Sequence, residues 1–442
     1  MSGGRSLRSI CAALALGAAV AGVPAAHAQD VEATAQPRAE ADTAKAVLLV
    51  TMGQGDAIWE RFGHNFLAVP DSTGRMVAYN WGVFDFAAPD FLSRFLLGDT
   101  KYWMEGNDLE QVLGYYRRFN RTITVQRLAL TPAQVDSLRA FLTWNDRPEN
   151  RYYRYDYFRD NCSTRLRDAL DRAMGGELRR QTEARITNAT YRSESVRLTD
   201  EDPASQLGIA TALGQPGDVP LSAWEAMFVP MRLQEYLRDI RIAGATGDTI
   251  PLVAEERVVF QAQRAPERAH APSFLAELGL PGLLAAGIIV LLARAAARGR
   301  RKAGVALAAL GGFWGGVAGT IGLVLLLAWV ATRHVHWYRN ENLFQFNPLA
   351  LTLLVLLPVA WRNPRWRPAA RTVAVGVAVL SCIGAALKFM PWMTQDNWAL
   401  IALALPINVA LAWAAMTALR VPAVQPGRAR RRDEPAPADR RR

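Results

Sequence analysis

Short apolar stretches of two kinds alternate along the first part of the chain. The stretches AVLLVTM, HNFLAVP, RMVAYNWGVF and RTITVQRLAL are rich in β-branched and aromatic residues, which predicts strands. The stretches DFLSRFLLG, LEQVLGYYRRF and TPAQVDSLRAFLTW repeat their apolar residues with helical spacing. Because both kinds are interleaved, we expect one mixed α+β domain over residues 46–271.

Beyond about residue 272 the pattern changes to long apolar segments. Each is long enough, or nearly so, to supply the roughly 20 apolar residues that cross a bilayer as a helix. The pattern predicts an all-α transmembrane bundle of about five helices over residues 272–420. The expected spans lie near residues 275–297, 305–331, 348–361, 372–388 and 397–419.

The two ends of the chain differ in composition from both of these regions. Arg5 and Arg8 precede an apolar run that closes on the small-residue site Ala26-His27-Ala28, a pattern typical of a secretory signal peptide over residues 1–28. Residues 29–45 are polar and predict a disordered linker. Residues 421–442 form a basic tail.

Charge adds an orientation to this picture. Basic residues gather in the loops RAAARGRRK and RNPRWRPAAR, after the first and third spans, and in the tail. Loops rich in Arg and Lys stay cytoplasmic, so we expect a multi-pass protein of the bacterial inner membrane, with its N-terminal domain periplasmic and its C-terminus cytoplasmic. This topology accounts for much of the net charge of +11, and we expect no nucleic-acid partner.

One cysteine stands out in the exported domain. Of the three cysteines, Cys11 lies in the signal peptide, Cys382 lies inside the fourth span, and only Cys162 lies in the domain. Exported proteins usually pair their thiols. Since Cys382 is placed at bilayer depth, we expect Cys162 to be a free thiol.

The residues around Cys162 predict a helix that begins at this cysteine. Asp160 or Asn161 is available as the N-cap, and two glycines follow the last apolar residue of the helix. Amide groups at a helix N-terminus lower a thiol pKa from about 8.5, and Arg165 acts in the same direction. We therefore expect a reactive thiolate; the alternative is a buried apolar cysteine.

A nucleophilic thiol needs a base, and the domain offers one histidine. His27 leaves with the signal peptide and three others lie close to the membrane spans, which leaves His64. A structural role for His64 alone is the alternative. Together, however, a cysteine at a helix start and a single histidine form the minimal nucleophile and base for acyl transfer.

Other chemistries lack their motifs. The sequence contains no HExxH, no paired CxxC, no GxSxG and no glycine-rich phosphate loop. We therefore expect no metal and no cofactor, and we do not expect a serine hydrolase of the common type.

The motifs ERFGHNFLAV and YDYFRDNCSTRLRDAL, together with the five-span C-terminus, resemble the Lnb family of bacterial lipoprotein N-acyltransferases. The order of His before Cys also resembles circularly permuted papain-like and NlpC-like domains. The resemblance implies that Cys162 is the nucleophile and His64 the base. It implies Asn80 as the residue that orients the imidazole, with Tyr79 as a second candidate.

The same resemblance implies a reaction. A membrane-embedded thiol acyltransferase would move the sn-2 acyl chain of a diacylglyceryl lipoprotein to the amine of its N-terminal cysteine, through a Cys162 thioester, and leave an N-acyl lyso-lipoprotein. The expected partners are this lipoprotein and membrane lipid. Candidate substrate-binding residues are Tyr79, Asn161, Arg165, His336 and Asn342.

Alternatives remain at this stage. His336 and Asn342 either contact the lipoprotein at the outer interface or cap the neighbouring spans. The protein could instead be a Cys–His amidase or peptidase that acts on cell-wall peptide. It could also be a non-catalytic membrane scaffold in which Cys162 and His64 are core residues.

Overall fold

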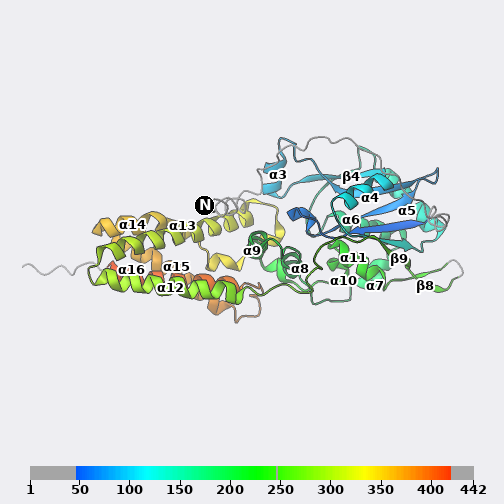
Figure 1. The fold of residues 1–442 in the computed structure, drawn as a ribbon. Coiled ribbons are helices and arrows are strands. Elements are labelled where there is room, and N and C mark those ends of the chain that lie inside the picture. The colour runs from blue at the N-terminus through cyan, green and yellow to red at the C-terminus, as the bar shows by residue number, and fades with distance from the viewer. Residues whose placement is uncertain (1–45, 245–246, 420–442) are drawn as a thin grey trace, which may run out of the picture.

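The computed structural model describes residues 46–244 and 247–419 of the 442-residue chain. The predicted signal peptide (1–28), linker (29–45) and basic tail (421–442) lie outside the described residues. An α+β domain and a bundle of long helices lie end to end (Figure 1).

An antiparallel sheet of seven strands forms the centre of the α+β domain, in the order β6-β4-β3-β2-β1-β5-β9. A separate hairpin joins β7 to β8. The strands are β1 Val47–Met52, β2 His64–Pro70, β3 Met76–Val83, β4 Lys101–Asp108, β5 Ile123–Leu128, β6 Tyr152–Arg154, β7 Arg241–Ala243, β8 Thr249–Pro251 and β9 Val253–Phe260.

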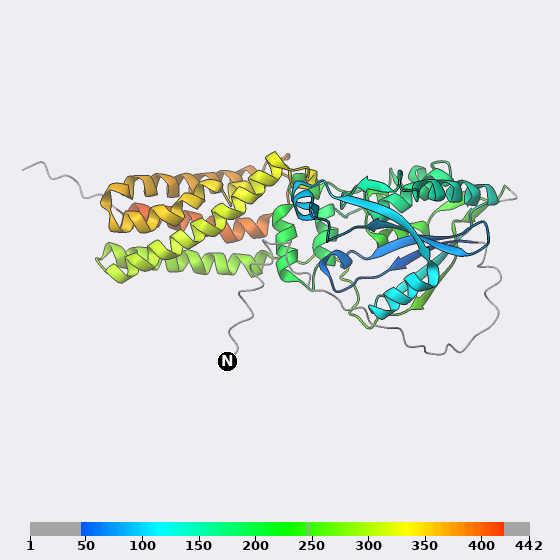
Figure 2. The same cartoon turned by 90° about the horizontal axis from the view of Figure 1, so that it is seen from above.

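Helices cover both faces of this sheet (Figure 2). One face packs against α4, and the larger core on the other face includes α5, α6 and the helices that follow them. The helices are α3 Phe91–Leu97, α4 Leu109–Arg118, α5 Pro132–Asn145, α6 Cys162–Ala173, α7 Glu177–Thr182, α8 Tyr191–Leu198, α9 Pro203–Ala212, α10 Ala223–Ala226 and α11 Pro230–Leu237, with 3-10 turns η1 Ile58–Glu60 and η2 Gln215–Asp218.

The side-chain alternation of β2 shows why the sheet has two cores. Phe66 and Ala68 point to the α4 side, while Leu67 and Val69 point to the α6 side, and all four are fully buried. The mixed α+β prediction is confirmed, with the four expected strands and three expected helices in place. The sheet strands β4, β6 and β9 and the hairpin strands β7 and β8 were not predicted.

The helical region contains five candidate membrane spans, which confirms the predicted number. The third is assembled from several short helical pieces, which explains its weak signal in the sequence. The elements are α12 Leu275–Ala297, α13 Arg301–Ala331, η3 Val335–Trp337, η4 Glu341–Phe344, η5 Pro348–Thr352, α14 Leu353–Arg362, η6 Pro364–Trp366, α15 Arg367–Leu387 and α16 Trp398–Ala418.

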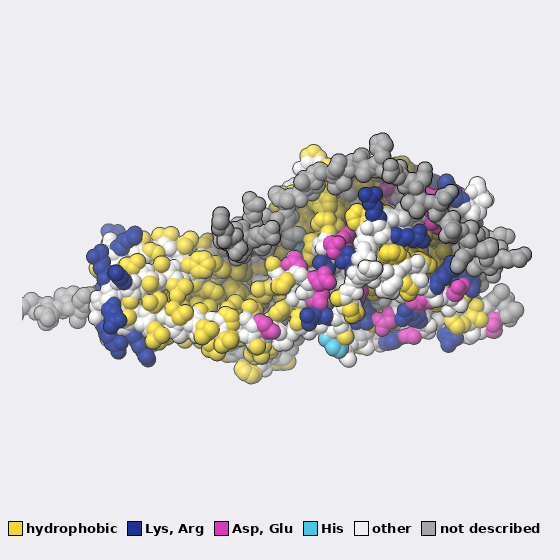
Figure 3. Space-filling model, viewed as in Figure 1, with side chains coloured by type: hydrophobic (Ala, Val, Ile, Leu, Met, Phe, Trp, Pro, Cys, Tyr) yellow, Lys and Arg dark blue, Asp and Glu magenta, His cyan; other side chains and the backbone are white. Residues whose placement is uncertain are grey.

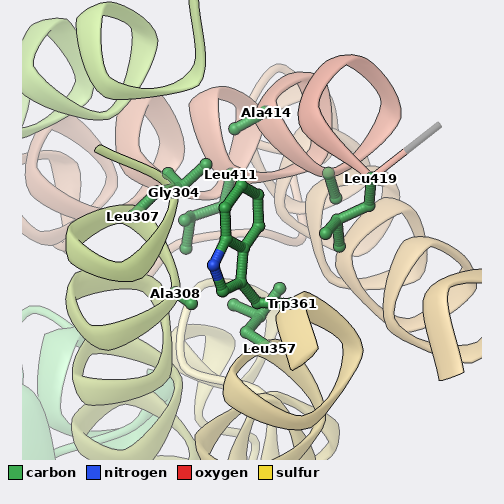
Figure 4. Close-up of a pocket in the computed structure, with 9 residues that line it drawn as sticks. Gly304, Leu307, Ala308, Leu357, Trp361, Leu411, Ala414 and Leu419 are labelled. Atoms are coloured by element: carbon green, nitrogen blue, oxygen red, sulfur yellow. The ribbon is translucent and has the colours of Figure 1, made fainter. Parts of the chain in front are cut away.

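Glycines on α13 let its neighbours approach closely. A methyl group on Gly319 would lie 2.2 Å from the main-chain nitrogen of Leu351, so only glycine fits there. Near the other end of α13, the indole of Trp361 lies over Gly304 and fills the space between α13 and α16 (Figure 4). Small residues at close helix contacts are typical of membrane bundles.

The two ends of the bundle differ in charge. Figure 3 shows Lys and Arg side chains gathered at the end remote from the α+β domain. The basic loops that join α12 to α13 and α14 to α15 lie at this end. The opposite end is joined to the α+β domain by main-chain and side-chain hydrogen bonds. Gly214 N–H donates to His336 O at 2.8 Å and Arg333 N–H donates to Leu97 O at 2.8 Å.

Candidate active site

His64, Asn80 and Cys162 are placed by three neighbouring elements. His64 is the first residue of β2, Asn80 lies in the adjacent strand β3, and Cys162 is the first residue of α6. The Nε2 of His64 lies 2.5 Å from Oδ1 of Asn80. Because an amide oxygen only accepts, Nε2 carries the proton, and Nδ1 of the neutral ring is the acceptor.

The position of Cys162 is fixed by a capped helix start. Of the two predicted N-cap residues, Asp160 and Asn161, the structure has Asn161. Its Oδ1 accepts a hydrogen bond from Thr164 N–H at 2.9 Å. Its Nδ2 donates to the carbonyls of Tyr157 and Phe228, at 3.0 and 2.9 Å. The side chain of Asn161 is buried and fully engaged within the protein.

Gly82 brings the cysteine and the histidine to the same place. It sits at an irregularity of β3 with φ +96°, a conformation that favours glycine. A methyl group at this position would lie 3.5 Å from Cβ of Cys162 and 3.9 Å from Cε1 of His64. The cysteine and the imidazole therefore border the same methyl-sized space.

Desolvation is the main influence on the protonation states of Cys162 and His64. Burial raises the pKa of the Cys162 thiol to about 11, although the main-chain N–H groups of Asn65, Ser163 and Cys162 itself favour the thiolate. Burial likewise lowers the pKa of His64 to about 4. The prediction of a depressed thiol pKa was wrong for this resting geometry, because desolvation outweighs the donors at the helix start. At neutral pH the site holds a thiol beside a neutral imidazole.

Sequence reasoning missed a cation beside this pair. Arg121 is buried, lies 4.9 Å from the ring centre of Tyr116 and has no partner for its Nη2. Its charge lowers the pKa of both His64 and Cys162, so it favours the thiolate that forms during attack. Tyr116 in turn stacks on His64 with ring centres 6.1 Å apart. A single arginine before a strand gives no sequence signal of this role.

Two further candidates near the site point elsewhere. Tyr79 is buried on the α5 side of β3, where its hydroxyl bonds Thr143; the structure does not bring it to His64. Arg165 pairs with Asp160 at 2.7 Å and lies over the ring of Tyr153.

The last two candidates lie at the junction with the helical bundle. His336 is 1% exposed, packs against Phe158 and Tyr191, and has no hydrogen-bond partner on either ring nitrogen. Asn342 is buried and donates to the carbonyl of Thr211 at the end of α9 at 2.9 Å. Both side chains therefore join the two parts of the molecule.

An antiparallel α+β domain with a Cys–His–Asn set, joined to five apolar helices, defines a membrane protein with a thiol-based candidate active site. Residues 33–195 match the family described as the Lnb N-terminal periplasmic domain. This match confirms the resemblance seen in the motifs, and the five candidate membrane spans indicate an inner-membrane protein. Comparison with curated proteins and with solved structures finds no match.

Proposed function

We propose that this protein is a membrane-embedded thiol acyltransferase. It moves the sn-2 acyl chain of a diacylglyceryl lipoprotein to the amine of that lipoprotein's N-terminal cysteine. The observation that carries the proposal is the juxtaposition at Gly82 of Cys162, at the start of α6, with His64, whose ring is held by Asn80. The Lnb-type domain supports the substrate class.

The first half-reaction forms a thioester. Sγ of Cys162 attacks the sn-2 ester carbonyl while the thiol proton passes to His64, which acts as a general base because the resting thiol is protonated. The main-chain N–H of Cys162 and neighbouring donors stabilise the oxyanion. The C–O bond then breaks, and His64 returns the proton to the departing glycerol oxygen.

The second half-reaction transfers the chain. The α-amine of the lipoprotein, with an ordinary pKa of about 7.7–8.0, attacks the thioester and gives its proton to His64. The C–S bond breaks, Cys162 recovers its proton from His64, and the N-acyl lyso-lipoprotein leaves. The amine attacks the thioester faster than water does, because the acyl donor and the amine belong to one molecule.

The junction with the helical bundle supports a membrane substrate. Tyr157 and Phe158 lie just before Cys162, and both rings pack against His336 of the loop that follows α13. The thiol is thus a few residues from side chains at the membrane surface. In the proposed topology this end faces the periplasm and the basic end faces the cytoplasm, as the positive-inside rule favours.

A papain-like fold of the α+β domain is part of the same proposal. A cysteine at the start of a helix that packs on an antiparallel sheet, with histidine and asparagine on earlier strands, supports a circularly permuted papain-like domain over residues 46–271. Asparagine holds the imidazole in papain-like sites as well.

The test uses cells that lack their own lipoprotein N-acyltransferase. Expression of the full chain should produce N-acyl lyso-lipoproteins, read by mass spectrometry of lipoprotein N-termini. Cys162→Ser and His64→Ala should abolish this product, because each removes one half of the reacting pair.

Cys382→Ser is the matched control, since this free cysteine lies on α15 far along the chain from the site, and it should retain full activity. If both site variants keep the product, the assignment of the site is wrong. If the wild type instead cleaves cell-wall peptide, the amidase alternative replaces the proposal.

A further inference from the structure

Large apolar side chains lie open on one membrane-proximal edge of the α+β domain. They come from η1, from the turn after β3 and from α3, and we call them the α3 surface. Leu96 is 59% exposed, and Leu92 lies four residues earlier on the same face of α3. The α3 surface consists of Trp59, Phe86, Leu92, Leu96 and Leu97.

The α3 surface lies where a membrane span ends. The carbonyl of Leu97 accepts from the main-chain N–H of Arg333, two residues after α13, and the carboxylate of Asp99 pairs with the Arg333 side chain at 2.9 Å. The ring of Phe95 contacts His334, with ring centres 6.5 Å apart. Figures 1 and 3 show α3 beside the end of α13, with hydrophobic side chains visible there.

Polar groups of α3 are turned to its other side. Arg94 donates from Nε to the carbonyl of Asp99 at 2.9 Å and pairs with the same residue's carboxylate at 3.3 Å. This pairing leaves the face with Leu92 and Leu96 apolar. Trp and Phe next to exposed leucines are typical of segments that enter the interfacial region of a bilayer.

A row of aromatic rings leads from this surface toward the reactive sulfur. Phe86 contacts Phe84 with ring centres 4.4 Å apart, Phe84 stacks on Tyr102 at 4.8 Å, and Tyr102 stacks on Tyr155 at 4.1 Å. Tyr102, Tyr155 and Cys162 all pack against the same core of the domain, so the row leads into the core that Cys162 borders.

We propose that the α3 surface enters the outer leaflet of the membrane and that the aromatic row from Phe86 to Tyr155 takes up an acyl chain and leads it to Cys162. The occupant is therefore the hydrocarbon chain of a membrane-anchored lipid. The role of the row rests on the proposed function, whereas the contact of α3 with lipid does not.

The contact is measured in nanodiscs of phosphatidylethanolamine and phosphatidylglycerol. A full-length variant with serine at positions Cys11, Cys162 and Cys382 receives Leu96→Cys and an environment-sensitive fluorophore. Phosphatidylcholine with a spin label in the upper part of its acyl chain should quench this fluorophore strongly.

Ile186→Cys in the same background is the control, because Ile186 is 67% exposed and follows α7, away from the bundle. Its fluorophore should be quenched severalfold less. Equal quenching at the two positions would overturn the proposed contact. A surface on α3 that binds a protein partner would give this result, because the nanodisc contains no such partner.

The delivery of the chain is measured separately with Leu92→Glu/Leu96→Glu. Transfer from a diacylglyceryl lipopeptide should fall by about tenfold or more, because two charged side chains oppose burial in lipid. Alkylation of Cys162 by water-soluble iodoacetamide should stay unchanged. Wild-type transfer by the double variant would refute the delivery role, whereas a wild type that transfers nothing would refute the proposed function and leave the quenching result standing.

Discussion

Asn80 and His64 meet across two adjacent strands, and their hydrogen bond decides which ring nitrogen is free. With Nε2–H donated to Oδ1 of Asn80 at 2.5 Å, Nδ1 is the ring's acceptor, and in the proposed mechanism it takes the proton of Cys162. The amide therefore fixes both the tautomer and the plane of the imidazole. It does so without the negative charge that a carboxylate would bring.

Asn80→Ala should lower kcat on the order of 10²-fold with little change in KM, because the ring loses its orientation but the substrate site is retained. Asn80→Asp should recover much of the rate and raise the pKa of His64, since a carboxylate favours the imidazolium. Steady-state kinetics over a pH series measures both effects.

Tyr79→Phe addresses the second candidate for the same role. The Tyr79 hydroxyl forms a hydrogen bond with Thr143, away from His64, so the rate of acyl transfer by this variant should be unchanged. A wild-type rate for Asn80→Ala together with a large loss for Tyr79→Phe would exchange the two assignments.

The pH dependence follows from the neutral pair. His64 has a pKa lowered to about 4, so it remains an unprotonated base as the pH falls below its ordinary value of about 6.5. Acylation of Cys162 should therefore persist to about pH 5 and fall only toward pH 4. Transfer to the amine should rise through pH 7.7–8.0, roughly where the lipoprotein's α-amine loses its proton.

Single-turnover acylation, followed by mass spectrometry of the intact protein, separates the first step from the second. An acid limb near pH 6.5 would contradict the lowered pKa of His64 and show that the imidazole keeps its ordinary pKa in the reacting state.

At the scale of elements, α6 depends on its cap. Asn161→Ala removes the acceptor for Thr164 N–H and leaves the buried carbonyl of Phe228 without its donor. We expect a loss of about 1–3 kcal/mol in stability and a lower Tm of the detergent-solubilised protein. Asn161→Asp keeps the acceptor and should lose less. A variant with normal Tm and a raised KM would show that Asn161 instead binds substrate.

The sequence predicts elements where one pattern dominates. The strand β2 and the span α12 agree with the expected ranges, because each is dominated by apolar residues over its length. The strand β4, KYWMEGND, was missed because acidic residues and a glycine interrupt its pattern. Cys162 and His64 were singled out from residue types and position, and Asn80 from the family resemblance. The raised thiol pKa was not predicted, because desolvation in the folded site outweighs the helix start.

At the scale of the molecule, a buried polar network joins the α+β domain to the bundle. Lys388 and Glu341 form an ion pair of 2.7 Å with both side chains almost fully buried. The same Glu341 accepts from Gln215 of η2 at 2.9 Å, and Gln395 donates to the carbonyl of Leu213 at 3.1 Å. This network holds the α+β domain against one end of the helical bundle.

Lys388→Met should leave the carboxylate of Glu341 buried without its cation and cost roughly 3–5 kcal/mol. We expect a clearly lower Tm, measured by intrinsic fluorescence in detergent, and reduced transfer. Adding Glu341→Gln should restore part of the Tm, because the second change removes the stranded charge. A single variant with wild-type Tm would contradict this account of the junction.

The five spans were predictable from length and apolarity, but the docking of the α+β domain on the bundle was not. His336 and Asn342 were expected to contact substrate or cap spans, and in the structure both have partners in the α+β domain. Such pairings join residues more than a hundred positions apart, and no local pattern reports them.

The raised pKa of the partly exposed Cys162 thiol also bears on how readily it is oxidised in the periplasm. Thiol–disulfide exchange starts from a thiolate, and oxidation to sulfenic acid does as well. A sulfur that stays protonated until a substrate arrives is a poor target for small oxidants. In the proposed mechanism, the same desolvation that disfavours its ionisation would let an unpaired cysteine act outside the cytoplasm without a dedicated reductant.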